Sequence, residues 1–142
     1  MKNKLRIVLD TNVFLVSLAE NYKYHIIFRG IVEDKFELFV SNEILTEYQE
    51  VIQSRYGLSK TDATLDFLLL LPNVHKIDPH FNWLLIEKDK DDNKFADCAM
   101  AANADFLVTN DKHFNVLKKV EFPKIPTIRA EEFIEILKEL IV

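Results

Sequence analysis

The chain has 142 residues, a length typical of one domain that can bury its own hydrophobic core. Its composition is 49% hydrophobic and 29% charged, with two Gly and four Pro, so we expect neither a disordered chain nor a low-complexity segment. The formal net charge of −5 argues against binding nucleic acid through bulk positive charge. Any such contact would have to depend on local Lys and Arg side chains.

The cysteine content and the apolar runs indicate where the protein is located. Cys98 is the single cysteine, which excludes an internal disulfide framework. The first apolar run, residues 5–9, is too short for a signal-peptide core and ends in Asp10. No window approaches the roughly 18 apolar residues that a membrane span requires. We therefore expect a cytoplasmic protein with no membrane contact.

Strands and helices are predicted to alternate in the first half of the chain. The continuous apolar run at 5–9 is typical of a buried parallel strand. Ser41 stands where a helix N-cap is expected, and Gly57 would end that helix. The expected elements here are a strand at 5–9, helices at 13–18 and 24–32, a strand at 37–40, and a helix from 41 to 57.

The alternation continues in the second half. Ser59, followed three residues later by Asp62, resembles a capping box and predicts a helix that begins there and reaches residue 71. Asp92 or Asn93 opens an Ala-rich helix, whereas residues 79–91 show no clear pattern. The other expected elements are strands at 74–77, 106–108 and 125–128, a short helix at 112–117, and an amphipathic helix at 130–140. Such alternation predicts an α/β fold with a parallel sheet covered on both faces.

Acidic residues follow two of the predicted strands. Asp10 ends the strand at 5–9, and Thr109-Asn110-Asp111 follows the strand at 106–108. In open parallel sheets, ligands bind beyond the carboxyl ends of the strands. A single Asp after a strand is more often a helix N-cap than a ligand. Two such endings, together with acidic residues at two helix starts, can converge on one cleft.

Two helices supply further candidates. Glu47 has apolar neighbours at helical spacing, so it lies near the buried side of its helix, although Glu43 and Glu50 compete with it and an ordinary surface Glu is the simpler interpretation. Asp92 begins the Ala-rich helix and can point toward the strand ends, whereas Asp97 lies further along that helix and ranks lower. Crowded carboxylates of this kind suit Mg²⁺ or Mn²⁺, which prefer oxygen ligands and can activate a water near neutral pH.

Three segments resemble the PIN-domain family, in particular the toxin components of bacterial and archaeal toxin–antitoxin pairs. They are IVLDTNVFLVSL, SNEILTEYQEVI and DKDDNKFADCAMAANADFLVTNDKHF, and with their spacing they cover nearly the whole chain. The resemblance implies one PIN-like domain over residues 1–142, folded as a three-layer α/β/α sandwich around a short parallel sheet. Residues 79–86 match the family least.

The resemblance also implies an activity. It suggests a metal-dependent endoribonuclease that hydrolyses RNA with Mg²⁺ or Mn²⁺ and leaves a 5′-phosphate and a 3′-hydroxyl. Four acidic residues would hold the metal, and Asp91 could replace Asp92 or hydrogen-bond beside it. The implied metal ligands and catalytic residues are Asp10, Glu47, Asp92 and Asp111. Residues expected to support the site or contact RNA are Thr11, Asn12, Asp91 and Thr109.

Partners and alternatives follow from the same resemblance. An antitoxin protein could occupy the cleft, and a homodimer is expected, with Tyr22, Tyr24, Phe28 and Phe81 as candidates for its apolar surface. The alternative is a catalytically silent PIN domain that binds RNA or a protein. Receiver domains and haloacid-dehalogenase-like phosphatases match poorly, since the former need a paired acid after the first strand and the latter need Asp-x-Asp.

Overall fold

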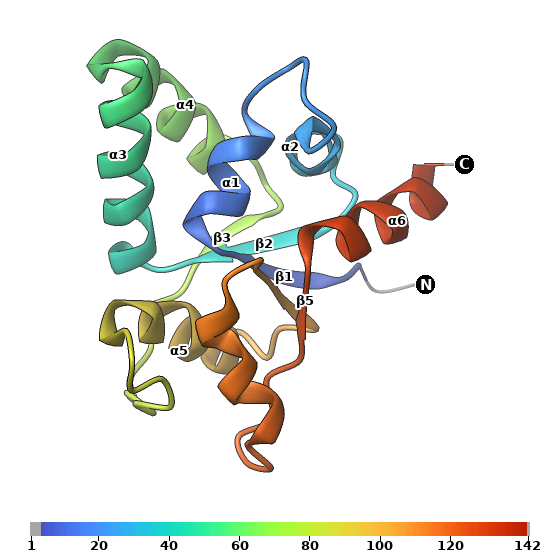
Figure 1. Ribbon diagram of the computed structural model, residues 1–142. Helices are drawn as coiled ribbons and strands as arrows, with labels where there is room; N and C mark the ends of the chain where they lie inside the picture. The colour runs from blue at the N-terminus through green and yellow to red at the C-terminus, as the bar shows by residue number, and fades with distance from the viewer. Residues whose placement is uncertain (1–3, 142) are drawn as a thin grey trace.

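The computed structural model describes residues 4–141 and shows a parallel sheet at its centre (Figure 1). The strand order is β3-β2-β1-β4-β5, and every neighbouring pair is parallel. Because the chain leaves β1 toward β3 and returns to β4 on the other side, the order reverses between β1 and β4. Ligands commonly bind at such a point. The strands are β1 (Arg6–Leu9), β2 (Glu37–Val40), β3 (Val74–Lys76), β4 (Phe106–Val108) and β5 (Thr127–Ile128).

Helices cover both faces of the sheet, which confirms the expected three-layer α/β/α sandwich (Figure 1). One face carries α1 (Thr11–Ser17), α2 (His25–Val32), α3 (Asn42–Tyr56), α4 (Leu58–Leu70) and α6 (Ala130–Ile141). The other face carries α5 (Asn93–Ala101) and the two 3-10 helices, η1 (Lys90–Asp92) and η2 (Lys112–Lys119). Within residues 4–141, no helix is long and apolar enough to cross a membrane.

The central strand β1 behaves as its sequence predicts. Ile7, Val8 and Leu9 are completely buried, because helices pack on both faces of the sheet. At the end of this strand, the buried Tyr48 hydroxyl donates a hydrogen bond of 2.6 Å to the carbonyl oxygen of Leu9. This bond connects α3 to the last residue of β1, directly before Asp10.

The start of α3 agrees with the sequence prediction, whereas the start of α4 does not. Ser41 is the N-cap of α3, since its hydroxyl accepts a hydrogen bond of 3.2 Å from the backbone N–H of Ile44. The predicted capping box at Ser59 is wrong, because α4 begins one residue earlier, at Leu58. Gly57, with φ of +88°, turns the chain directly from α3 into α4, and its carbonyl accepts the hydroxyl and the backbone N–H of Thr61.

Candidate metal centre

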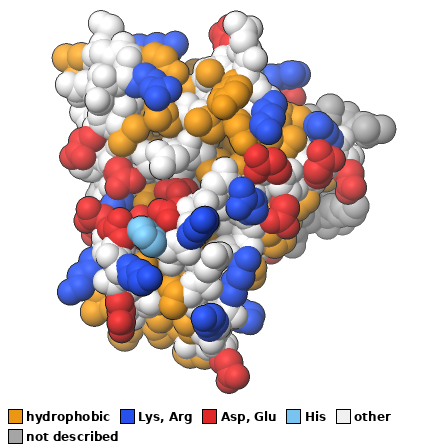
Figure 2. Space-filling model, in the orientation of Figure 1, with side chains coloured by type: hydrophobic (Ala, Val, Ile, Leu, Met, Phe, Trp, Pro, Cys, Tyr) orange, Lys and Arg blue, Asp and Glu red, His pale blue; other side chains and the backbone are white. Residues whose placement is uncertain are grey.

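Four separate elements bring the four predicted acidic residues to the carboxyl edge of the sheet. Asp10 follows β1, Asp111 follows β4 after two intervening residues, Glu47 lies in the second turn of α3, and Asp92 lies where η1 meets α5. These carboxylates are close enough to influence each other, since Asp111 and Glu47 help raise the pKa of Asp10, and Asp111 and Asp10 help raise that of Asp92. Figure 2 shows acidic side chains gathered around a histidine on this face, with basic side chains beside them.

Asp10 is a buried carboxylate held by its neighbours. Its side chain accepts a hydrogen bond of 2.8 Å from the Thr109 hydroxyl, and the residue is only 6% exposed. Burial raises the pKa of Asp10 to about 6. Hydrogen bonds from the Thr109 hydroxyl and the Thr11 backbone oppose this effect, whereas the charges of Asp111 and Glu47 add to it. Within the described residues, no cationic side chain is among the main influences on the pKa of Asp10.

Glu47 is partly buried and contacts α1 and α5 through its carboxylate. Its carboxylate accepts the Thr11 hydroxyl on one oxygen and forms an ion pair of 2.9 Å with Lys94 Nζ on the other. The competing residues of α3, Glu43 and Glu50, are exposed and line a surface groove together with Glu47, which we call the outer groove. The rotation of α3 therefore places Glu47 next to α1 and α5, where sequence reasoning alone favoured a surface residue.

Among the described residues, Asp92 has a buried carboxylate whose hydrogen-bonding capacity is not satisfied. Its Oδ2 atom is buried and has no hydrogen-bond partner. His113 Nδ1 lies 3.6 Å away, which is too long for a hydrogen bond. Burial, followed by the charges of Asp89, Asp111 and Asp10, raises the pKa of Asp92 to about 6. A buried carboxylate oxygen without a donor is costly, and a cation would compensate it.

Asp111 and Thr109 connect the ends of two strands. Thr109 donates its hydroxyl proton to Asp10 and accepts a hydrogen bond of 3.0 Å from the backbone N–H of Asp111. Asp111 caps η2 by accepting the backbone N–H of His113 at 2.9 Å, and the imidazole of His113 lies 3.4 Å from the same carboxylate. One hydroxyl therefore orients the acidic residues that follow β1 and β4.

The remaining predicted residues have different surroundings. Asn12 is exposed and lines a pocket with Asp10 and Asp111. Asp91 is exposed and, with Glu47, lines the outer groove, while its carbonyl oxygen accepts Lys94 Nζ at 2.8 Å. Asp97 is buried and accepts the backbone N–H of Trp83 at 2.9 Å, so it anchors the loop before α5.

Sequence reasoning missed three residues at this site. Lys94 is 10% exposed and pairs with Glu47, and His113 contacts two of the acidic residues. Asp89, Asp92 and His113 have potential ligand atoms that all lie within 4.8 Å of one another. The available signal was spacing, because Lys94 and His113 each follow a predicted ligand by two residues. Asp89 and Lys94 lie in a run of mixed charge, which is usually a solvated loop, so the sequence offered no reason to select them.

The side chains present fit a hard divalent cation. The candidate donors are carboxylate oxygens from four elements, burial and their charges raise the pKa of Asp10 and Asp92, and one buried oxygen has no hydrogen-bond donor within the described range. Mg²⁺ and Mn²⁺ favour such oxygen donors and would offset these charges.

Comparisons with known proteins concern the family and the fold. A family model described as a PIN domain matches residues 6–113, which is more than half of the chain. No curated protein matches. VapBC2 from Rickettsia felis, solved bound to a DNA fragment from their promoter, has a similar structure with a TM-score of 0.59 and 18% identity, covering 88% of this chain and 98% of that chain. DNA-bound VapBC from Salmonella typhimurium gives a TM-score of 0.61 and 16% identity, covering 89% and 98%.

Proposed function

The chain belongs to the PIN domain family, and from this premise we propose that it is a metal-dependent endoribonuclease that hydrolyses RNA phosphodiester bonds. Members of the family generally use divalent metals. One observation carries the proposal: acidic residues from four elements meet where the strand order reverses, and one of them, Asp92, has a buried oxygen without a donor. This arrangement suits a bound cation and a phosphate better than it suits structural stability.

The proposed ligands of Mg²⁺ or Mn²⁺ are Asp10, Glu47, Asp92 and Asp111. When bound, such an ion supplies a nucleophilic water near neutral pH and offsets the charge of the phosphate. The protein's own contribution is orientation, since Thr109 holds Asp10 and Thr11 holds Glu47 through their hydroxyl groups. The expected products are a 5′-phosphate and a 3′-hydroxyl.

Neighbouring side chains complete the proposed site. Lys94 holds the Glu47 carboxylate in its orientation through the 2.9 Å ion pair. His113 lies against both Asp92 and Asp111 and restrains their positions. Asn12 lines the adjoining pocket, where its exposed amide can donate to a phosphate or ribose oxygen. These positions separate residues that hold the metal from residues that contact RNA.

We further propose that the protein is the toxin of a toxin–antitoxin pair. The sequence motifs support this assignment, and so does the fold shared with the two VapBC structures. A cleft of carboxylates would attract a cationic side chain of an antitoxin. Tyr22 and Tyr24 line the pocket beside Asp10 and could contact such a partner.

A homodimer is a separate part of the proposal. Among the aromatic residues considered for its surface, Phe81 is strongly exposed and lies beside Trp83, with ring centroids 4.9 Å apart. Phe28 instead packs against Phe14 at a centroid distance of 6.5 Å, so it contributes mainly to the core. Sedimentation of the wild-type protein beside a Phe81→Ser variant would test Phe81 as an interface residue.

The test of the nuclease is a cleavage assay with a matched control. Pure protein is incubated with structured and single-stranded RNA in Mn²⁺, Mg²⁺ or EDTA, together with Asp10→Asn and the control Asp66→Asn. Asp66 is an exposed residue of α4 whose side chain forms no hydrogen bond or ion pair with any other residue of the described range 4–141. We expect cleavage that requires metal, disappears in Asp10→Asn and persists in Asp66→Asn.

Other outcomes have definite meanings. No cleavage with either metal, by folded protein free of any partner, would contradict the nuclease and favour a domain that binds RNA or protein without cutting it. Equal cleavage by Asp10→Asn would contradict the role assigned to this site.

A further inference from the structure

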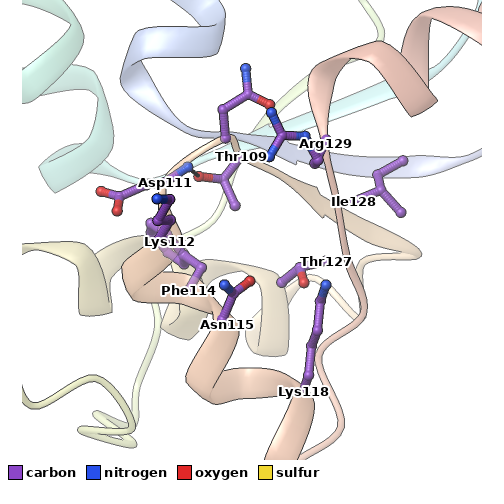
Figure 3. Close-up of a pocket in the computed structure, with 10 residues that line it drawn as sticks. Thr109, Asp111, Lys112, Phe114, Asn115, Lys118, Thr127, Ile128 and Arg129 are labelled. Carbon is purple, nitrogen blue, oxygen red and sulfur yellow. Dashed lines mark hydrogen bonds between the residues drawn. The ribbon is translucent and has the colours of Figure 1, made fainter.

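A polar pocket of about 240 Å³ opens directly beside the candidate metal centre (Figure 3). Asp111 is part of its wall, so the pocket and the metal centre are continuous. The η2 helix contributes Lys112, Asn115 and Lys118 to the pocket, and the segment around β5 contributes Thr127 and Arg129. We refer to this hollow as the η2–β5 pocket.

The pocket concentrates positive charge in an acidic protein. Lys112, Lys118 and Arg129 line it, whereas the whole chain has a net charge of −5. Across residues 4–141, the ion pairs of the structure include none of these three side chains. Glu131, the acidic neighbour of Arg129, already contacts Tyr24 and Lys23. Within this range, the three cations are therefore not held in ion pairs, although Asp111 adds one negative charge to the same wall and the charge of Arg129 helps to lower the pKa of Glu131.

We propose that the η2–β5 pocket binds a backbone phosphate of the RNA strand next to the bond that is cut. This inference rests on the proposed nuclease function and assigns the positive contacts that an acidic protein needs for RNA. Lys118 and Arg129 supply the charge, and Arg129 can present two parallel N–H donors to phosphate oxygens. Asn115 and Thr127 supply neutral hydrogen-bonding groups on the same walls.

Two features favour a phosphate over a nonpolar ligand. The walls carry ammonium, guanidinium, amide and hydroxyl groups. Asp111 belongs both to the pocket wall and to the candidate metal centre, so the two sites adjoin, and a strand bound at one is within reach of the other. Contacts to phosphate position a nucleic acid without selecting its sequence. The pocket would therefore fix the register of the strand relative to the metal.

The test measures RNA affinity separately from cleavage. A labelled single-stranded RNA is titrated with Asp10→Asn protein in Mg²⁺, followed by fluorescence anisotropy at several salt concentrations. Lys118→Gln and Arg129→Gln are compared with Lys119→Gln, each added to the Asp10→Asn background. Lys119 is a matched control because it is the exposed neighbour on η2 but does not line the pocket.

We expect each pocket variant to weaken RNA binding about two- to fivefold, as for loss of one exposed charge contact. Each should also reduce the slope of log affinity against log salt by about 0.7, the value for one phosphate on a single strand. Lys119→Gln should change neither quantity. In the catalytically active background, the pocket variants should raise KM more than they lower kcat.

The outcomes distinguish this inference from the proposed function. If wild-type protein cleaves RNA and both pocket variants match Lys119→Gln in affinity and KM, the pocket inference is wrong while the nuclease stands. If wild-type protein does not cleave but the pocket variants weaken RNA binding, the nuclease is wrong, and the pocket contacts RNA without positioning a bond for cleavage. Absence of RNA binding by Asp10→Asn protein with an intact pocket would overturn the pocket inference, whereas the nuclease is decided by cleavage with wild-type protein.

Discussion

Replacing Asp10 with Asn should stabilise the protein without metal while abolishing its response to metal. Asn has nearly the same size and lacks the charge. Burial raises the pKa of Asp10 from 3.8 to about 6, so the folded state disfavours the ionised carboxylate. Since each pKa unit corresponds to about 1.4 kcal/mol, Asp10→Asn should increase the free energy of unfolding by about 3 kcal/mol at pH 7.5.

The sign of the pH dependence follows from the raised pKa. The contribution of protonated Asp10 to stability is fully present below pH 3.8 and is lost as the pH rises through about 6. The advantage of the Asn variant should therefore be small in acid, about 1 kcal/mol at pH 4.5, and reach its full size above pH 6.5. The carbonyl oxygen of Asn can still accept the Thr109 hydroxyl, which limits other effects.

Urea unfolding in EDTA at pH 4.5 and 7.5 measures this difference. Repeating it in Mn²⁺ at about 100 times the dissociation constant should stabilise the wild type by about 2.7 kcal/mol and leave Asp10→Asn unchanged. Asp66→Asn, on exposed α4, controls for a general effect of removing charge. An Asn variant that is less stable than wild type at pH 7.5, or equally favoured at both pH values, would refute the reasoning.

Four other predictions test the surroundings of the site. Thr109→Val should weaken Mn²⁺ binding at least tenfold by calorimetry, because its hydroxyl orients the acidic residues after both central strands, and unchanged affinity would contradict that role. Tyr48→Phe should lower the free energy of unfolding by about 1 to 2 kcal/mol, since the buried carbonyl of Leu9 loses its donor; no loss would contradict the bond. Gly57→Ala should cost about 1 to 3 kcal/mol through backbone strain alone, because an added Cβ meets no atom within 4 Å, so an equally stable variant would show that the turn relaxes. Cys98 is buried and its pKa is raised to about 12, so its thiol should react with a disulfide reagent at pH 8 only after urea is added; prompt reaction of native protein would contradict its burial.

The sequence alone determined the order of elements and two of the candidate ligands. The strands at 37–40 and 106–108 have the predicted bounds, because short apolar runs next to turn residues encode buried strands locally. Asp10 and Asp111 could be paired in advance, since the carboxyl ends of parallel strands meet at one edge. These inferences required only periodicity and a general property of parallel sheets.

The tertiary structure decided which acidic residues of the helices lie beside Asp10 and Asp111. Glu43, Glu47 and Glu50 are the same residue type within two turns of one helix. The packing of α3 against α1 brings Glu47 to Lys94 and the Thr11 hydroxyl. In the same way, the turn through η1 buries an oxygen of Asp92 and leaves Asp91 exposed. Apolar spacing indicates the buried side of a helix, but the neighbours that a partly buried side chain reaches depend on how the helices pack together.

The basic pocket also depends on tertiary structure. Lys118 lies on η2 and Arg129 follows β5, and they line one pocket because β5 pairs with β4 in parallel and brings the residue before α6 to the same side as η2. The sequence established that an acidic chain needs local cations to contact RNA. Which cations lie together depends on pairings between distant segments, whose free energy comes from the packing of the whole core.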